Sequence, residues 1–232
     1  MMRSHCTAGT AWNGTHAELN ALAYNIEGDR NSFSDLERTR IVDIWHRVAE
    51  DLAPYDIDVT TERPSSFNSR TGTILVTHSI DANGNAINCT SCGGVAYVNV
   101  FGTSNYHTYY SPALVFYDKI GGGGETYVAE ASSHEFGHNL GLSHDGTTTG
   151  DAYYSGHGSG LVSWAPIMGN SYNNNVTEWS GGSSDGDTFR FEYSLNNGSS
   201  YSTLFIVSAT SNSNLQTAVI AGSPSGSVII RV

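Results

Sequence analysis

The stretch SSHEFGHNLGLSHDG, residues 132–146, decides the fold and the chemistry of this chain of 232 residues. His134 and His138 are four residues apart, so on a helix their side chains lie on one face, with Cβ atoms roughly 5 to 6 Å apart. Two imidazoles at that spacing can bind one ion. Gly141 stands where the helix has to end, because glycine takes the positive φ that a C-terminal turn requires. His144 can then return as a third nitrogen ligand.

Three neutral imidazoles on Zn²⁺ leave the fourth coordination position open, whereas structural zinc sites close all four positions with protein ligands. A water in the open position has its pKa lowered to about 7, so a neighbouring base can take its proton. Glu135 directly follows the first histidine and is placed to contact such a water without binding the metal. It can accept the proton and pass it to the departing amine. The stretch therefore predicts hydrolysis of peptide bonds.

The competing interpretation is a helix that is merely rich in histidine. H-E-x-x-H alone occurs by chance in helices that bind nothing, but here the pattern extends to H-E-x-x-H-x-x-G-x-x-H, which favours zinc binding. His78, His107 and His157 are isolated in the sequence. We interpret these three as ordinary surface or core residues and do not assign them to the metal.

The segment HEFGHNLGLSHD, residues 134–145, resembles the metzincin clan of zinc endopeptidases, and Asp145 after the third histidine is typical of its reprolysin-like, secreted microbial branch. Downstream, SWAPIMG, residues 163–169, is similar to the Met-turn of that clan. The resemblance implies that Met168 forms an apolar floor beneath the zinc without binding it. The astacin and serralysin branches carry a tyrosine two residues after this methionine, but this chain has Asn170.

The resemblance covers about residues 10–180 and implies an α/β (α+β) fold. The expected architecture is a twisted mixed sheet with two long helices, a zinc cleft, a small irregular C-terminal subdomain and a short β-rich tail. In that clan an antiparallel edge strand pairs with the extended substrate. GVAYVNVF, residues 94–101, is our candidate for this strand, although an interior strand without a substrate role fits the sequence equally well.

Local patterns give the elements independently of any resemblance. Apolar residues recur at helical spacing over residues 34–52, and Ser34 with Glu37 forms a capping-box signal. A second helix is predicted over residues 125–142. Alternation or a high content of β-branched residues predicts six strands. Three precede the histidine cluster, at residues 55–62, 71–80 and 94–101, and three follow it, at residues 188–195, 202–210 and 226–232.

A change of composition near residues 179–187 suggests two domains. We predict a metzincin-like catalytic domain over residues 1–182. Residues 183–232 form a β-rich segment that is shorter than a complete β-sandwich of about 100 residues, so it is either an incomplete module or a set of strands added to the main domain.

Ten basic against 22 acidic residues give a net charge of −12, which excludes binding to nucleic acid or anionic lipid through a basic surface. No apolar run approaches the ~20 residues that span a bilayer. No signal peptide is readable, yet the loop-rich composition is typical of a secreted, extracellular protein. For the CTSC pair we favour a disulfide between Cys89 and Cys92 over a reactive thiol pair. We expect a monomer that acts on protein or peptide substrates.

Two other functions remain open at this level. One is a catalytically inactive binding or adhesion module that keeps zinc for stability, although Glu135 would be free to disappear from such a protein because it does not hold the metal. The other is a zinc amidase that acts on a non-protein substrate. It would hydrolyse small amides and leave unfolded proteins intact.

Overall fold

The computed structural model describes residues 5–180, 188–194, 202–208 and 229–231. The chain divides into two compact units, Met1–Ser143 and His144–Val232, and each is described by itself below. This division is a grouping by contacts, so the catalytic domain over residues 1–182 and the β-rich segment over residues 183–232 stay predictions.

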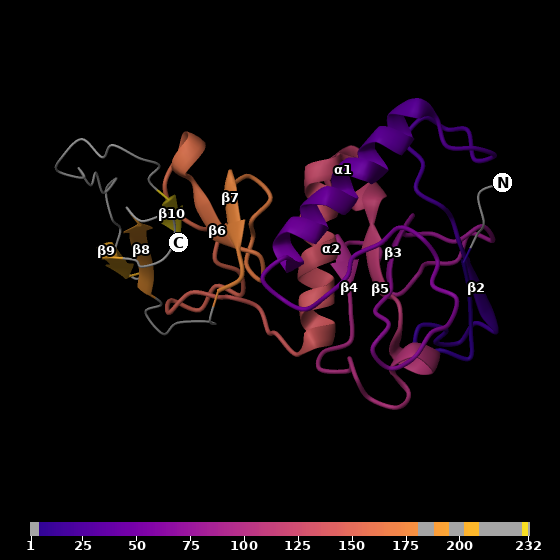
Figure 1. The fold of residues 1–232 in the computed structure, drawn as a ribbon. Helices are drawn as coiled ribbons and strands as arrows, with labels where there is room; N and C mark the ends of the chain where they lie inside the picture. The colour runs from indigo at the N-terminus through magenta and orange to yellow at the C-terminus, as the bar shows by residue number, and fades with distance from the viewer. Residues whose placement is uncertain (1–4, 181–187, 195–201, 209–228, 232) are drawn as a thin grey trace. The chain divides into compact units, whose positions relative to one another are not determined.

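A three-stranded mixed sheet forms the centre of the first unit (Figure 1). Strand β5 (Ala113–Phe116) lies between β3 (Ile74–Thr77), to which it is parallel, and β4 (Gly94–Val95), to which it is antiparallel. All four residues of β5 are buried, as expected for an apolar run in the middle of a sheet. Strand β4 is therefore the edge strand of this sheet among the described residues.

Two long helices accompany the sheet, and they confirm the mixed α/β architecture. Helix α1 (Asp35–Leu52) begins with the predicted capping box, in which the Ser34 side chain accepts from the backbone N–H of Glu37 and the Glu37 carboxylate accepts from that of Ser34. Helix α2 (Glu125–Leu140) packs against α1 and against β5 (Figure 1). Because α2 has neighbours on both sides, it is the more buried helix.

Three sequence predictions need correction: one strand is absent, one strand is much shorter, and one helix ends earlier. Residues 55–62 form no strand, although the carbonyl of Val59 accepts a hydrogen bond from Trp45 Nε1 at 2.7 Å. The strand predicted over residues 94–101 is a ladder of only two residues, because the following segment turns to bond the end of α2. Helix α2 ends at Leu140, two residues before the predicted boundary. The ladder of β4 is thus short because of backbone hydrogen bonds to α2, whereas the end of α2 is set by the local bonds of Gly141 and Leu142.

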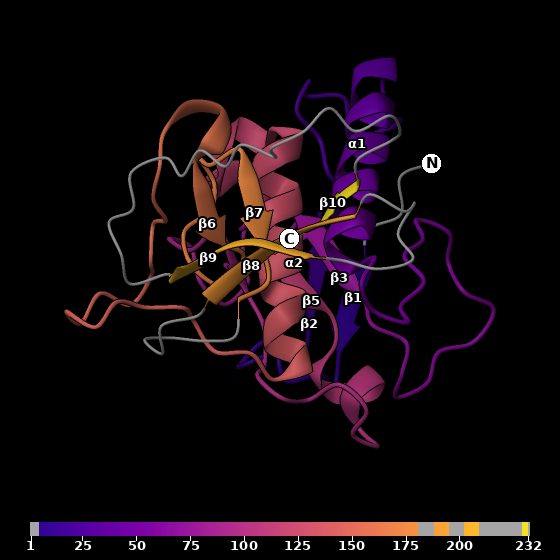
Figure 2. The same cartoon turned by 60° about the vertical axis from the view of Figure 1, so that its left-hand side comes forward.

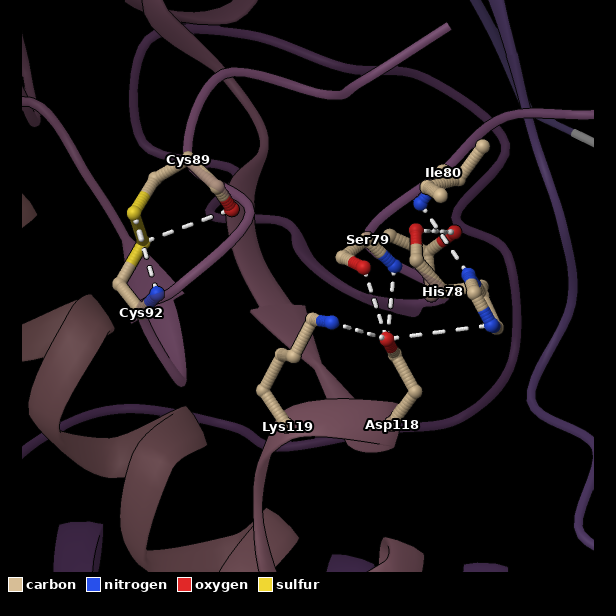
Figure 3. Close-up of polar contacts among 8 residues, drawn as sticks. His78, Ser79, Ile80, Cys89, Cys92, Asp118 and Lys119 are labelled. Atoms are coloured by element: carbon tan, nitrogen blue, oxygen red, sulfur yellow. Dashed lines mark hydrogen bonds and ion pairs between the residues drawn. A yellow bond between two sulfur atoms is a disulfide. The ribbon is translucent and has the colours of Figure 1, made fainter. Parts of the chain in front are cut away.

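An N-terminal hairpin completes the first unit, with β1 (His5–Ala8) antiparallel to β2 (Glu18–Ala21). The described core cluster beside it consists of Trp12, Leu19, Ala21, Ile87, Leu114 and Phe116. The predicted disulfide between Cys89 and Cys92 is present, just before β4 (Figure 3). Figure 3 also shows Asp118 accepting hydrogen bonds from the backbone N–H and the hydroxyl of Ser79, each at 2.7 Å.

The second unit contains two small sheets. Strands β6 (Trp164–Pro166) and β7 (Val176–Glu178) pair in parallel and lie side by side in Figure 2. The other sheet has the order β10-β8-β9, with β8 (Thr188–Ser194), β9 (Ser202–Ser208) and β10 (Ile229–Arg231) all antiparallel to their neighbours. These three strands fall where the alternating segments of the tail predict them.

Short helical turns occupy Tyr106–Tyr110, Tyr117–Lys119, Gly121–Gly123 and Gly160–Val162. Within the part of the chain that the structure describes, no helix combines the length and the apolar character needed to cross a bilayer.

Candidate active site

Helix α2 presents His134, Glu135 and His138, and its C-terminal end is fixed by a Schellman motif. Gly141 has φ = 105° and donates its backbone N–H to the carbonyl of His138 at 2.9 Å, while Leu142 donates to the carbonyl of Gly137 at 3.0 Å. A residue with a side chain rarely adopts such a φ. The glycine therefore allows the chain to change direction immediately after the helix.

The three histidines of the sequence motif come together. Nitrogen atoms of His134, His138 and His144 all lie within 4.8 Å of one another. The rings of His134 and His138 are nearly perpendicular, with centroids 4.9 Å apart. Nδ1 of His138 lies 2.8 Å from the carbonyl of Leu142, and since a carbonyl can only accept, this nitrogen carries the proton and Nε2 keeps its lone pair for a metal. The ring of His144 packs against that of Tyr153, with centroids 4.2 Å apart.

The donor set fits zinc. Imidazole nitrogen is a preferred zinc ligand, and three such ligands leave a position for water or substrate. Nitrogen ligands about 2.0 Å from a tetrahedral zinc ion are roughly 3.3 Å apart, so small side-chain rotations bring this cluster onto one ion. Burial lowers the pKa of His138, with a smaller opposing effect from the carbonyl of Leu142. This favours the neutral form that binds metal.

Glu135, which follows His134 in the sequence, has a buried carboxyl group within the first unit. Only 7% of the residue is exposed, and burial raises the pKa of Glu135 to about 8. Its Oε2 atom has no hydrogen-bond partner among the described residues. A buried oxygen left without a partner is costly, which is expected where a ligand completes the site. A nearby dication would favour the ionised carboxylate and so oppose the effect of burial.

The segment after β4 fixes the last turn of α2, and this part of the site was missed by sequence reasoning. Asn139 is 1% exposed; its side chain donates to the carbonyl of Tyr97 at 2.8 Å and accepts from the hydroxyl of Tyr106 at 2.9 Å. The backbone N–H of Asn99 donates to the carbonyl of His138 at 2.8 Å. The bond from Asn99 reaches a carbonyl of the last helical turn, where carbonyls lack partners within the helix, and the other two bonds provide partners for the buried Asn139 side chain. No local pattern could indicate them, because they join residues about 40 positions apart.

In the second unit, Asp145 is buried and links the end of the motif to the Met-turn. Its backbone N–H donates to the carbonyl of Met168 at 2.9 Å, and its side chain accepts from the hydroxyl of Ser180. Its own carbonyl accepts from the backbone N–H of Tyr154 at 2.6 Å. Met168 is 1% exposed, in a turn closed by a bond from the N–H of Gly169 to Pro166. The aspartate thus connects two segments that sequence analysis treated as separate motifs.

Comparison with known proteins supports the same chemistry. The family model described as Metallo-peptidase family M12B Reprolysin-like matches residues 49–145, a span that includes all three histidines and Glu135. Searches of curated proteins and of solved structures found no significant match. The match to this family and the histidine cluster together imply zinc as the metal.

Proposed function

We propose that this chain, whose residues 49–145 form a reprolysin-like metallopeptidase segment of family M12B, is an endopeptidase that uses Glu135 as its general base. His134, His138 and His144 hold the zinc ion in this proposal. The observation that carries it is the buried carboxyl group of Glu135, one residue from the first of three converging histidines. A protein that used the metal only for stability would have no need of this carboxyl group.

When bound, zinc supplies a Lewis acid that polarises the scissile carbonyl and lowers the pKa of the attacking water. Oε2 of Glu135, the oxygen without a partner in the described residues, accepts one proton from that water as its oxygen bonds to the carbonyl carbon. Glu135 then delivers the proton to the amide nitrogen, and the C–N bond breaks to give an amine and a carboxylic acid, whose remaining proton passes to the amine or to solvent. Burial keeps bulk water from competing for the carboxyl group.

Strand β4 supports binding of an extended peptide. The N–H of Phe116 bonds the carbonyl of Gly93 at 2.8 Å, so the next residue, Gly94, belongs to a non-hydrogen-bonded pair with Val115. In an antiparallel ladder the N–H and C=O of such a residue point away from the partner strand. The edge thus offers backbone groups for a substrate strand, which is why we propose a protein or peptide substrate. We also retain the proposals that the protein is secreted and that Met168 and Gly141 support the metal site.

The decisive experiment compares wild type with Glu135→Gln for zinc content and for hydrolysis of unfolded casein. We expect one zinc ion in both and a loss of roughly 100-fold to 10,000-fold in rate for the variant, because a general base contributes about that much. Glu125→Gln, at the start of the same helix and remote from the histidines in sequence, is the matched charge control and retains activity.

Each alternative outcome has a distinct meaning. Zinc in both proteins with no hydrolysis of casein or of small amides by either would favour a binding module. Hydrolysis of small amides alone would favour an amidase. Wild-type rates for Glu135→Gln would refute the assigned base.

A further inference from the structure

Gly94, a residue of the edge strand without a side chain, lies against the side chain of Glu135. A Cβ atom placed on Gly94 would lie 2.6 Å from both Cγ and Oε1 of Glu135 and 2.9 Å from Cδ. Real Cβ atoms essentially never approach other heavy atoms within 3.0 Å. We propose that Gly94 is a positioning residue for Glu135. Because Gly94 has no side chain, the backbone of β4 packs directly against the Glu135 carboxyl group, as a wall that holds it in its catalytic position.

Strand β4 cannot move back to make room for a side chain at this point. On its far side the carbonyl of Gly93 is bonded to Phe116 of the buried strand β5. The disulfide between Cys89 and Cys92 closes the turn that precedes the strand (Figure 3). Val95 and Cys92 pack against the core cluster defined above. The wall is therefore held by a hydrogen bond, a covalent link and apolar packing.

The backbone of α2 cannot move away either, because Ala131, Ser132 and Ser133 on the preceding turn are at most 2% exposed. The Glu135 side chain is the part of this contact that can rotate. A methyl group at position 94 would thus force a different rotamer on Glu135 and move its carboxyl group, while the three histidines keep their places. The proposal rests on the proposed role of Glu135 as the base, and the experiments below separate the two.

The first experiment measures Gly94→Ala against Gly72→Ala. A Cβ on Gly72 would also collide with a side chain of α2, the ring of Phe136, which is the residue after Glu135. Gly72→Ala is therefore a control for a steric clash with α2 that leaves the carboxyl group of Glu135 untouched. We expect Gly94→Ala to keep zinc and KM but to lose about 100-fold in kcat, as a misplacement of about 1 Å can cause. Gly72→Ala should lower Tm and leave kcat within about threefold of wild type. Wild-type kcat for Gly94→Ala, or an equal kcat loss in both variants, would overturn the proposal.

The second experiment needs no activity. Gly94→Ala is introduced into wild type and into Glu135→Ala, and Tm is measured in the zinc-free proteins. If the contact is as described, the methyl group lowers Tm in wild type but not in Glu135→Ala, where the colliding atoms are gone. Equal shifts in the two backgrounds would refute the contact. If Gly94→Ala does not fold, folding of the double variant supports the proposal, and failure of both overturns it.

These results distinguish the proposal from the function on which it rests. An inactive wild type with a background-dependent Tm shift would reject the peptidase function and keep the steric contact. An active wild type with the same Tm shift in both backgrounds would keep the peptidase function and reject the contact between Gly94 and Glu135.

Discussion

At the scale of single residues, two carboxyl groups on the packed helices α1 and α2, the buried Glu135 and the partly buried Asp51, have raised pKa values for the same first reason. Burial raises the pKa of Glu135 to about 8 and that of Asp51 to about 6. Asp51 also accepts the hydroxyl of Ser133 at 2.5 Å, which opposes the effect of burial on its pKa, whereas Oε2 of Glu135 has no hydrogen-bond partner among the described residues. Our proposed base is therefore Glu135 and not Asp51, because Asp51 has an internal hydrogen-bond partner.

Asp51 makes stability depend on pH. Burial raises its pKa first, the Ser133 hydroxyl opposes this, Glu130 and Glu50 raise it further, and Arg47 lowers it. Because the folded-state pKa of about 6 exceeds the ordinary aspartate value of 3.8, the folded state binds more protons than the unfolded state between these two pH values. The contribution of Asp51 to stability is thus full below pH 3.8 and is lost as the pH rises through about 6.

We therefore expect Asp51→Asn to stabilise the zinc-free protein at pH 7.5 by about 1 to 2 kcal/mol, after discounting for the exposed part of the group, and to have little effect near pH 4. Urea unfolding at both pH values measures this, with Asp43→Asn on the exposed side of the same helix as control. A gain that is equal at the two pH values would contradict the assignment to Asp51.

At the scale of elements, the site depends on how α2 ends. The Schellman motif at Gly141 provides hydrogen bonds for the last carbonyls of the helix and redirects the chain before His144. Backbone N–H groups of residues 99–101, after β4, donate further hydrogen bonds to carbonyls of the same turn. Two of the three proposed ligands, His134 and His138, thus lie on the helix, and the way the helix ends lets the chain bring the third, His144, close to them.

Gly141→Ala should cost about 1 to 2 kcal/mol of stability, because alanine is strained at φ = 105°. A Cβ at this position would also lie 3.1 Å from Oδ1 of Asn99, so we expect weaker zinc binding as well. Gly150→Ala is the matched control, since Gly150 has φ = 102° with nothing within 4 Å of an added Cβ. It should lose stability and keep zinc affinity. Competition with a chromogenic chelator measures the affinity, and unchanged zinc affinity in Gly141→Ala would argue against a role for this turn in the site.

At the scale of the whole molecule, we expect zinc binding and folding to be coupled, because the histidines come together only in the folded chain. A ligand that binds only the folded state adds about 2.7 kcal/mol at a free concentration of 100 times its Kd. For a chain of this size that corresponds to a Tm shift of roughly 5 to 10 °C.

Removal of the metal with a chelator should lower Tm of wild type and of Glu135→Gln by the same amount, because in the proposed site the glutamate is not a ligand of the ion. His138→Ala, which lacks a ligand, should show no further loss when the chelator is added. Differential scanning calorimetry with and without chelator tests this. A smaller shift for Glu135→Gln than for wild type would place Glu135 among the ligands and contradict its assignment as a free base.

The sequence by itself determined the elements and residues that depend on local spacing. The capping box at Ser34, the helix that carries His134 and His138, and the disulfide of the CTSC pair all follow from patterns a few residues long. The same holds for the strands of the tail, where alternation extends over several residues.

Only the tertiary structure decided which backbone segments meet these elements. Residues 55–62 have strand composition but form no ladder, and β4 is short because the chain after it bonds the end of α2. The contact of Gly94 with Glu135 and the network around Asn139 likewise join residues far apart in the chain. Such contacts arise when elements pack, and local periodicity carries no information about which atoms then come within contact distance.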